Sequence, residues 1–255
     1  MTRATHCYPE FGEAVTQVAR RIDPSRIDSM WAMPAAQTDR QHFVAPDLRV
    51  DVLVRVDATG RATVFAFGPT LVPSRHLVRA GMVHAGVRLA VGEGAVLLGV
   101  SASALAGRQI QLETKLDPEA GTDAERVAHS LERVVHEAQP RGAMKAPSWV
   151  RACVDAMQQQ RWASVGKLAR GAGVSERTLR REFLRWVGLG PKAVLRMARA
   201  REATQQLAHG LPPAEVAVAV GCADQAHLTR ELKTFFSVTP GELVKRPVLA
   251  EFFNP

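Results

Sequence analysis

Three arginines, Arg177, Arg180 and Arg181, stand close together in the stretch from Lys167 to Phe183. The guanidinium group of arginine is a planar fork that can donate two hydrogen bonds to O6 and N7 of one guanine in the major groove. A spacing of three or four residues places such side chains on one face of a helix. The stretch therefore has the residue types of a helix that reads double-stranded DNA. A solvated face of a basic helix is the alternative interpretation.

The segments around these arginines have the form of a helix-turn-helix. A short apolar helix leads to Gly173, and Ser175 is well placed to cap the N-terminus of the helix that follows. The stretch from Glu215 to Leu232 repeats this order with its turn at Gly221. In such a pair the second helix enters the major groove. Two copies joined by one long predicted helix favour DNA binding much more strongly than one copy would.

The second copy supplies a different set of side chains for the groove. They are Gln225, Ala226, His227, Thr229 and Arg230. Glutamine can bond an adenine edge, alanine can touch a thymine methyl group, and arginine can take a guanine or a phosphate. His227 is expected to contact phosphate or solvent rather than to act as a pH switch. Lys192 and Lys233 are expected to contact phosphates, which fix the register on DNA but carry no sequence information.

The region from about residue 148 to 246 resembles the DNA-binding domain of AraC/XylS-type bacterial transcription regulators. The matching positions are Leu168-Ala169, Gly173-Val174-Ser175, Thr178-Leu179, Arg181, Phe183, Gly188, Pro191, Arg199, Ala203, Leu207, Gly221, Asp224-Gln225, Leu228, Arg230 and Thr239-Pro240. The resemblance implies an all-α domain with two helix-turn-helix motifs joined by a long helix. It also implies that Arg177, Arg180 and Arg181 contact DNA and that Arg199 braces the two motifs.

The chain departs from the family pattern in the second motif. Cys222 and Leu232 stand where the family usually has aromatic residues. The core expected beneath the second recognition helix, Val218, Leu228 and Leu232, therefore has less apolar bulk. The first motif is accordingly expected to dominate the discrimination between bases.

Positive charge is concentrated in the half of the chain that carries these motifs. Residues 1–140 contain 15 Lys and Arg against 16 Asp and Glu, whereas residues 141–255 contain 18 against 9. Clustered cations favour a polyanionic partner, because neutralising phosphates releases condensed counterions. No apolar stretch of about 18 residues and no N-terminal signal pattern occurs, so a cytoplasmic protein without a membrane partner is expected.

The N-terminal half is expected to be an α+β domain. Residues 11–22 suggest a short helix, and residues 50–56 and 62–67 suggest a hairpin with its turn at 58–61. Residues 77–90 contain either a further strand pair or one long bent strand. Short helical pieces are expected at 95–99 and 102–105. Thr122 and Glu125 fit a capping box for a helix that runs to about Ala138.

Two prolines and a glycine interrupt every periodicity between Gln139 and Ser148. We therefore expect a sensor or dimerisation domain at 1–140, a linker at 141–148 and the DNA-binding domain at 149–255. Helices are expected at 149–160, 164–172, 175–187, 191–209, 214–220, 224–236 and 240–244.

Nothing in the sequence indicates an enzyme, a metal site or a cofactor. Cys7, Cys153 and Cys222 have no metal-ligand spacing, and no GxSxG, Walker-A or GxGxxG pattern is present. The cysteines are interpreted as plain thiols. Two further readings stay open at this point, namely a domain used only for nucleoid or RNA binding and an enzyme with an appended DNA-binding module.

The role of the N-terminal domain follows from the resemblance, which implies a small-molecule effector or a homodimer. Aromatic side chains and a histidine form the candidate ligand-binding set: Trp31, Phe43, Phe65, Phe67 and His84. A plain hydrophobic core explains the same residues. The remaining partners that the resemblance implies are double-stranded promoter DNA and RNA polymerase.

Overall fold

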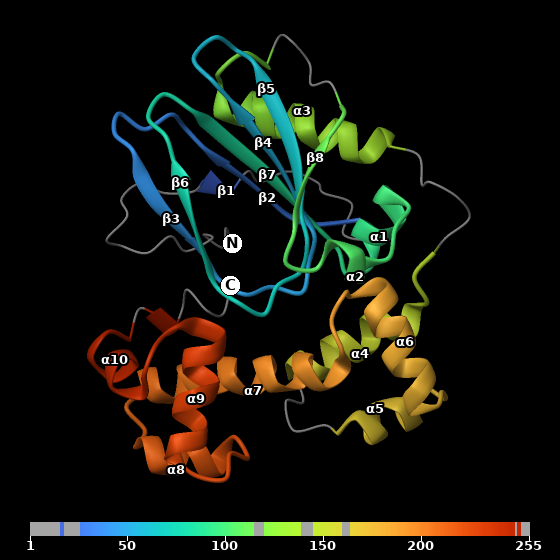
Figure 1. The fold of residues 1–255 in the computed structure, drawn as a ribbon, viewed down its shortest axis with the longest axis vertical. Helices are drawn as coiled ribbons and strands as arrows, with labels where there is room; N and C mark the ends of the chain where they lie inside the picture. Colours follow the sequence, from blue (N-terminus) through green and yellow to red (C-terminus); the bar gives the residue numbers. More distant parts are fainter. Residues whose placement is uncertain are drawn as a thin grey trace.

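The computed structural model describes residues 16–17, 26–114, 120–138, 145–159, 164–247 and 249–250. Its N-terminal part is β-rich, and its C-terminal part, which begins at Ser148, contains only helices (Figure 1). This arrangement confirms the fold classes predicted from the sequence. The linker proposed at 141–148 lies partly outside the described residues, and Ser148 already belongs to a helix. The expected domain boundaries therefore stay a prediction.

The larger sheet is antiparallel and has six strands in the order β1-β2-β7-β4-β5-β8. They are β1 (Thr16–Gln17), β2 (Ile27–Met33), β7 (Val83–Leu89), β4 (Asp51–Val56), β5 (Ala62–Phe67) and β8 (Gln109–Leu112). β4 and β5 form the predicted hairpin, with Val56 opposite Ala62. The helix predicted over 11–22 is wrong at residues 16 and 17, which pair with β2 as a strand. The rest of that stretch lies outside the described residues.

A second, two-stranded ribbon consists of β3 (Arg40–Val44) and β6 (Ser74–Val78), and it lies beside the larger sheet (Figure 1). The sequence left open whether residues 77–90 form a strand pair or one bent strand. The structure contains two strands there, but β6 pairs with β3, whereas β7 lies between β2 and β4. The division of one stretch between two sheets creates a space between them, and that space is the cavity described below.

Helix α3 (Ala124–Glu137) covers the other face of the larger sheet. Strand β4 shows the alternation that this requires, because Val52, Val54 and Val56 are buried while the intervening side chains are half-buried. Val127 and Leu131 of α3 are fully buried in the same core cluster. The sheet therefore packs its apolar face on α3 and turns its more polar face toward the ribbon.

The N-terminal start of α3 corrects one prediction. Asp123, not Thr122, is the N-cap residue, and its carboxylate accepts a hydrogen bond from the backbone N–H of Arg126 at 2.9 Å. The cap must be the last extended residue before the helix, and Asp serves this role as well as Thr does. The two short helical pieces are confirmed as α1 (Glu93–Leu98) and α2 (Ala102–Leu105).

The C-terminal part follows the predicted order of helices closely. It consists of α4 (Ser148–Gln159), α5 (Val165–Gly171), α6 (Glu176–Trp186), α7 (Pro191–Ala208), α8 (Pro213–Ala219), α9 (Gln225–Phe236) and α10 (Pro240–Lys245). The long helix α7 runs between two groups, with α4, α5 and α6 at one end and α8, α9 and α10 at the other (Figure 1). None of the described helices combines the length and the apolar character needed to cross a membrane.

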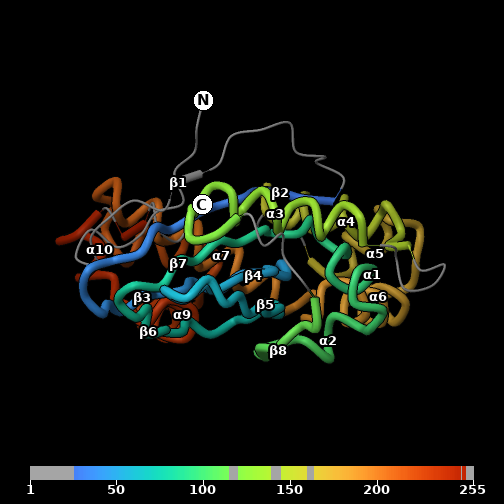
Figure 2. Tube along the Cα trace, turned by 90° about the horizontal axis from the view of Figure 1, so that it is seen from above, coloured from blue at the N-terminus to red at the C-terminus, as the bar shows by residue number. Residues whose placement is uncertain are grey.

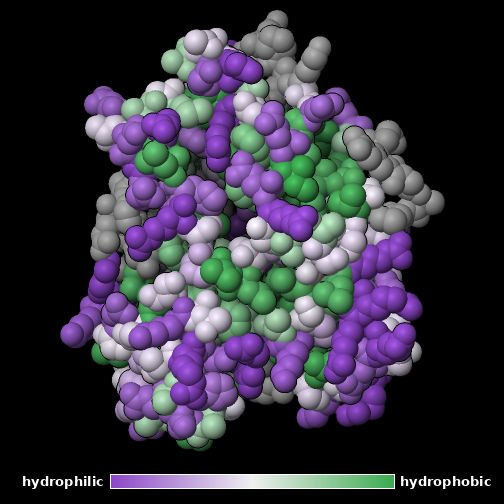
Figure 3. All heavy atoms as spheres, viewed as in Figure 1, coloured by the Kyte–Doolittle hydropathy of each residue, from purple (hydrophilic) through white to green (hydrophobic). Residues whose placement is uncertain are grey.

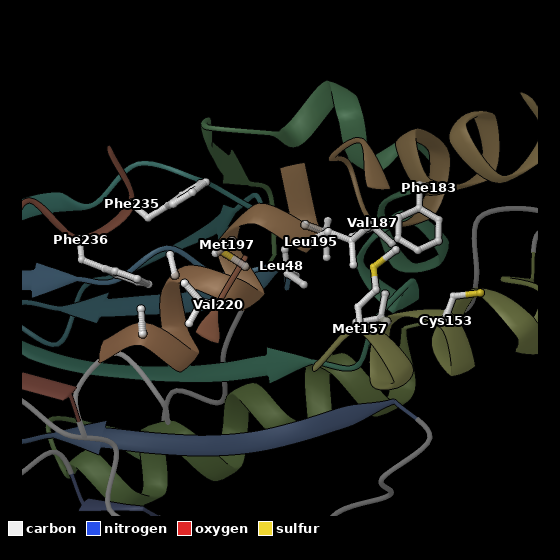
Figure 4. Packing of buried hydrophobic residues seen from close by; sticks show 14 of the residues in the cluster. Leu48, Cys153, Met157, Phe183, Val187, Leu195, Met197, Val220, Phe235 and Phe236 are labelled. Atoms are coloured by element: carbon white, nitrogen blue, oxygen red, sulfur yellow. The ribbon is translucent and has the colours of Figure 1, made fainter. Parts of the chain in front are cut away.

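One hydrophobic cluster runs through all seven C-terminal helices and continues into the N-terminal part. Met157 and Phe183 lie near one end of α7, and Phe235 and Phe236 lie near the other (Figure 4). Five N-terminal residues belong to the same cluster: Leu48, Val91, Ala95, Val96 and Ala102. Shared burial of apolar surface therefore stabilises the contact between the two parts. Seen along the view of Figure 2, the N-terminal elements lie over the whole length of the C-terminal helices.

Candidate nucleic-acid interface

The first helix-turn-helix consists of α5 and α6, and local interactions fix the turn between them. Gly173 has a φ of 67°, a left-handed conformation that favours glycine. Two residues later, the Ser175 hydroxyl accepts a hydrogen bond from the backbone N–H of Thr178 at 3.1 Å and so caps α6. Leu179, Phe183 and Trp186 are buried beneath the helix. Packing on this side turns the opposite side of α6 toward solvent.

The three predicted arginines all lie on the exposed side of α6. Arg180 pairs with Glu176 at 3.4 Å, and Arg181 pairs with Glu182 at 2.9 Å. Arg177 makes neither a hydrogen bond nor an ion pair with another described residue. Exposed ion pairs contribute little, about 0–1 kcal/mol, so Arg180 can exchange Glu176 for DNA at small cost. Figure 3 shows hydrophilic residues dominating the surface over α5 and α6.

Sequence reasoning missed Glu182, whose side chain is largely buried in α6. Its carboxylate accepts hydrogen bonds from Nε1 of Trp186 and Nε of Arg181, both at 2.9 Å. Burial alone would raise the pKa of Glu182, but these hydrogen bonds hold it below its usual value. A signal was present in the sequence, because the pair Arg-Glu recurs at 181–182 and 230–231. In each motif the glutamate stands three residues after a leucine of the recognition helix.

The second helix-turn-helix consists of α8 and α9 and has the same local construction. Gly221 has a φ of 70°, and the Asp224 carboxylate caps α9 by accepting a hydrogen bond from the backbone N–H of His227 at 2.6 Å. Leu228 and Leu232 are fully buried, as predicted. Val218 was predicted to be core and is not, because its side chain is 76% exposed on α8.

Two phenylalanines near the C-terminal end of α9 add aromatic side chains to the core of the second motif. Phe235 and Phe236 are both buried, with ring centroids 6.3 Å apart. They lie one turn beyond Leu232, so they were not counted when the expected core was assembled from the family positions. The expected loss of apolar bulk beneath α9 therefore left out the two phenylalanines at the C-terminal end of the helix.

The predicted groove-facing residues of α9 divide into two groups. Gln225, Ala226 and Arg230 are exposed. His227 is half-buried, and its Nδ1 accepts a hydrogen bond from the backbone N–H of Ala223 at 3.2 Å. Thr229 donates its hydroxyl to the carbonyl of Gln225 at 2.9 Å. The exposed group is available to bases, whereas His227 and Thr229 already serve the local structure.

An arginine on α7 that the resemblance did not single out fixes the position of α9. Arg196 donates from Nη2 to Glu231 at 2.7 Å and from Nε to both carboxylate oxygens at 3.2 Å. These hydrogen bonds raise the pKa of Arg196 above its usual value. Arg199 makes no hydrogen bond or ion pair within the described part of the chain. Arg196 with Glu231 therefore links α7 to α9, while the guanidinium of Arg199 lies beside the turn at Gly221 and Cys222, so a bracing role for Arg199 stays a prediction.

The remaining two predicted DNA contacts are exposed lysines. Lys192 lies in the first turn of α7 and Lys233 lies in the last turn of α9. The structure thus places all ten predicted DNA-binding residues on α6, the start of α7 and α9.

The N-terminal part contains a cavity of about 170 Å³ between the larger sheet and the β3–β6 ribbon. Four of the proposed ligand-binding residues line it, namely Trp31, Phe43, Phe67 and His84. Phe65 lies beside it instead, beneath the guanidinium of Arg55 at 4.8 Å. A side chain at position 86 would close this space, since a Cβ there would lie 2.3 Å from the Trp31 ring. Glycine therefore lets the indole lie flat across the sheet.

Charged residues join this cavity to the C-terminal part. Nη1 of Arg88 pairs with Asp47 at 2.9 Å, and its Nε pairs with Asp51 at 3.1 Å. Burial would raise the pKa of Asp47, but Arg88 and Arg49 hold it far below its usual value. From α7, Arg201 donates to the neighbouring Pro46 carbonyl at 2.7 Å. The wall of the cavity thus touches the helix that connects the two motifs.

Two further contacts link the parts at other positions. Arg151 of α4 pairs with Asp28 at 3.4 Å, and the Ser101 hydroxyl donates to the Leu184 carbonyl at the end of α6 at 3.3 Å. No group of three or more His, Cys, Asp or Glu side chains in the described part of the chain is arranged to hold a metal ion.

The chain was compared with family models, curated proteins and solved structures. A family model described as a helix-turn-helix domain matches residues 168–246. A search of curated proteins found no match. The chain is similar to an AraC-type transcriptional regulator from Chromobacterium violaceum, with 24% identity over 38% of this chain and 90% of that one and a TM-score of 0.37.

Two other solved structures show similar values. The C-terminal domain of AraT, a response regulator from Geobacillus stearothermophilus, is 22% identical over 40% of this chain and 88% of its own, with a TM-score of 0.36. ToxT from Vibrio cholerae is 8% identical over 85% and 96%, with a TM-score of 0.42. The family model and the two capped helix pairs together identify residues 168–246 as a helix-turn-helix domain.

Proposed function

We propose that this protein is a transcription regulator of the AraC/XylS type that binds specific sequences of double-stranded DNA in the cytoplasm. The observation that carries the proposal is the pair of recognition helices, α6 and α9, which lie at opposite ends of one rigid helix. Each has a buried apolar side and an exposed side with arginine or glutamine. We also propose that the protein contacts RNA polymerase and that it is not an enzyme.

The dimensions of α7 suit two successive contacts on one face of DNA. The helix has 18 residues, which corresponds to a length of about 27 Å. Adding the width of the recognition helices brings their separation close to one turn of DNA, roughly 34 Å. A single chain can then reach two neighbouring major-groove segments.

We assign base reading to Arg177, Arg180 and Arg181 in the first motif and to Gln225, Ala226 and Arg230 in the second. His227 and Thr229 are assigned a supporting role near the backbone. Lys192 and Lys233 are assigned to phosphates, so their loss would weaken binding to all sequences about equally.

We further propose that the N-terminal part controls DNA binding through a small-molecule effector in the cavity. The contacts between Arg201 and Pro46 and between Ser101 and Leu184 support this, because they connect the cavity and its neighbouring helices to α7 and α6. Dimerisation through the N-terminal part is the alternative form of control, and sedimentation of the full chain with and without bound DNA distinguishes it.

The test begins with recovery of genomic fragments bound by the full chain. Fluorescence anisotropy then compares a recovered fragment with its shuffled sequence at one salt concentration. We expect a preference of about 1,000-fold or more for the recovered fragment. The Arg177→Ala/Arg180→Ala variant should lose most of this preference, while Arg79→Ala, which changes an exposed arginine of the N-terminal part, should retain it. Equal affinity of the unaltered protein for both fragments would point to general nucleoid or RNA binding instead.

A further inference from the structure

The face of the larger sheet that lines the cavity is organised in three rows of cross-strand neighbours. The first row is Met33, His84 and Arg55, the second is Trp31, Gly86 and Leu53, and the third contains Arg88 and Asp51. The rows differ in chemistry, because the first carries a cation and an imidazole, the second is apolar, and the third is an ion pair. A ligand that spans the three rows would contact a polar, an apolar and an ionic environment, one after the other.

The charges in the third row are already neutralised. Arg88 is paired with both Asp47 and Asp51, and Arg49 is paired with Asp28 and Asp47. Burial would lower the pKa of Arg88, but the two carboxylates raise it well above its usual value, so the cation is strongly held. At this end, both arginines that line the cavity already have carboxylate partners.

The first row differs, because Arg55 contacts no carboxylate among the described residues. Its guanidinium carbon lies 4.8 Å from the Phe65 ring centroid, and burial lowers its pKa while leaving it ionised. An arginine that lines a cavity without an anionic partner attracts an anion more strongly than it would in water, because the surrounding dielectric is lower.

Two imidazoles, those of His76 and His84, lie near this arginine, and a third, that of His42, lies near Arg40. We name His42, His76 and His84 the cavity histidines. All three line the cavity, with His42 opposite His76 in the ribbon. Burial lowers the pKa of each, to about 4 for His42 and His84, so all three are neutral at pH 7. A neutral imidazole has one N–H to donate and one nitrogen that accepts.

His84 has a specific capacity for a further hydrogen bond. Only 5% of its surface is exposed, and its buried Nδ1 has no hydrogen-bond partner in the described part of the structure. A buried polar atom without a partner destabilises the protein, and a ligand that bonds to it removes this cost. The His84 ring stands next to Arg55 across the β4–β7 pair, so one anionic group can reach both side chains.

We propose that the cavity binds a small organic acid with one carboxylate, held by Arg55 and His84, and a phenyl-sized or short aliphatic body that lies on Trp31. This inference depends on the proposed control by an effector and names the chemical class of that effector. One unpaired cation suits one negative charge. The middle row provides no polar group besides the indole N–H of Trp31, which donates but does not accept a hydrogen bond. Both carboxylates that line the cavity, Asp47 and Asp51, are already paired with Arg88, so neither attracts an amine.

The volume of the cavity sets the size of the body. A dry apolar cavity of about 150 Å³ accepts benzene, and this cavity has about 170 Å³. A single ring or a chain of similar volume therefore fills it. Such a body would reach the Arg88–Asp47 pair, next to the Pro46 carbonyl that Arg201 of α7 contacts. A ligand in the cavity can thereby change the contact between the N-terminal part and α7.

Calorimetry on the full chain tests the proposal with benzoate and hexanoate as probes. Their neutral analogues, benzamide and hexanamide, have nearly the same shape without the charge, and benzylamine reverses the charge. We expect each carboxylate to bind about 10-fold or more tightly than its amide, and benzylamine not to bind. Arg55→Gln should weaken carboxylate binding by about 10- to 100-fold and should abolish the difference between acid and amide.

Two further variants separate the site from general effects. Arg75→Gln removes an exposed arginine from the outer side of the ribbon and should leave binding unchanged. His84→Gln should weaken the carboxylate by less than Arg55→Gln does. Circular dichroism and DNA binding of each variant show that it is folded.

Three outcomes would overturn the inference: no binding of either carboxylate at millimolar concentration, equal binding of acid and amide, or the same loss in Arg75→Gln as in Arg55→Gln. Each can occur while the protein still prefers its recovered DNA fragment, which leaves the proposed function intact. Conversely, carboxylate binding with the expected pattern in a protein without sequence preference would refute only the proposed function.

Discussion

The brace between α7 and α9 allows one perturbation to be worked out in detail. Arg196→Met keeps most of the aliphatic stem but removes the guanidinium that bonds to Glu231 through three hydrogen bonds. The Glu231 side chain is only 10% exposed, and its remaining neighbour is Nε2 of the His227 imidazole at 3.5 Å. The variant therefore leaves a carboxylate that is nearly buried and poorly compensated.

The magnitude follows from the burial of the two partners. Removing one partner of a fully buried ion pair costs about 3–5 kcal/mol. The Arg196 side chain is 40% exposed, so water can replace part of the interaction and the lower range for charged hydrogen bonds, about 1.5–3 kcal/mol, applies. Loss of the contact with the Phe235 ring, at 5.5 Å, adds about 0.5 kcal/mol. We expect a loss of about 2–3 kcal/mol in the free energy of unfolding.

Urea unfolding followed by circular dichroism measures this loss. The control is Arg230→Ala, which removes an exposed arginine from α9, the helix that carries Glu231, and should change the unfolding midpoint little while weakening DNA binding. The double variant Arg196→Met/Glu231→Met should be more stable than Arg196→Met alone, because it leaves no unpaired buried charge. A change below about 0.5 kcal/mol in Arg196→Met, or a double variant less stable than the single one, would refute the reasoning.

Three other predictions concern DNA, pH and the cavity. Arg180→Ala should cost about 1–3 kcal/mol and relax the preference at one guanine, and Gln225→Ala should cost less; selection from a randomised site library decides which helix dominates. Two of the cavity histidines have pKa values lowered to about 4, so below about pH 6.5 the unfolded chain takes up protons that the folded protein does not. The free energy of unfolding should therefore fall from pH 7 to pH 5 by roughly 2 kcal/mol for each of the two histidines, or about 4 kcal/mol together, and glutamine in place of these histidines should flatten the profile. Gly86→Ala should displace the Trp31 ring and destabilise the protein by about 1–3 kcal/mol, whereas Gly171→Ala, which meets open space, should not; a neutral Gly86→Ala in urea unfolding would contradict the packing described here.

The helices of the C-terminal part and their buried faces could be predicted from the sequence alone. Each of its helices begins and ends at signals within a few residues, such as the Ser175 and Asp224 caps and the left-handed turns at Gly173 and Gly221. Apolar positions three and four residues apart then define the buried side of each helix, so Arg177 and Arg180 had to lie on the other side. Such interactions are local, and a short window of sequence contains all the partners.

Other features were decided only by tertiary structure, because their partners are far apart in the chain. β2 pairs with β7 across more than fifty residues, and the stretch 77–90 is divided between two sheets whose other strands lie elsewhere. The exposure of Val218 and the pairing of Arg196 with Glu231 depend on how α8 and α9 pack against α7. The cavity arises in the same way, because Trp31, Arg55 and His84 come from three strands that only the antiparallel register brings together. Periodicity identifies which residues share a face of one element, whereas the register between distant strands decides which faces meet.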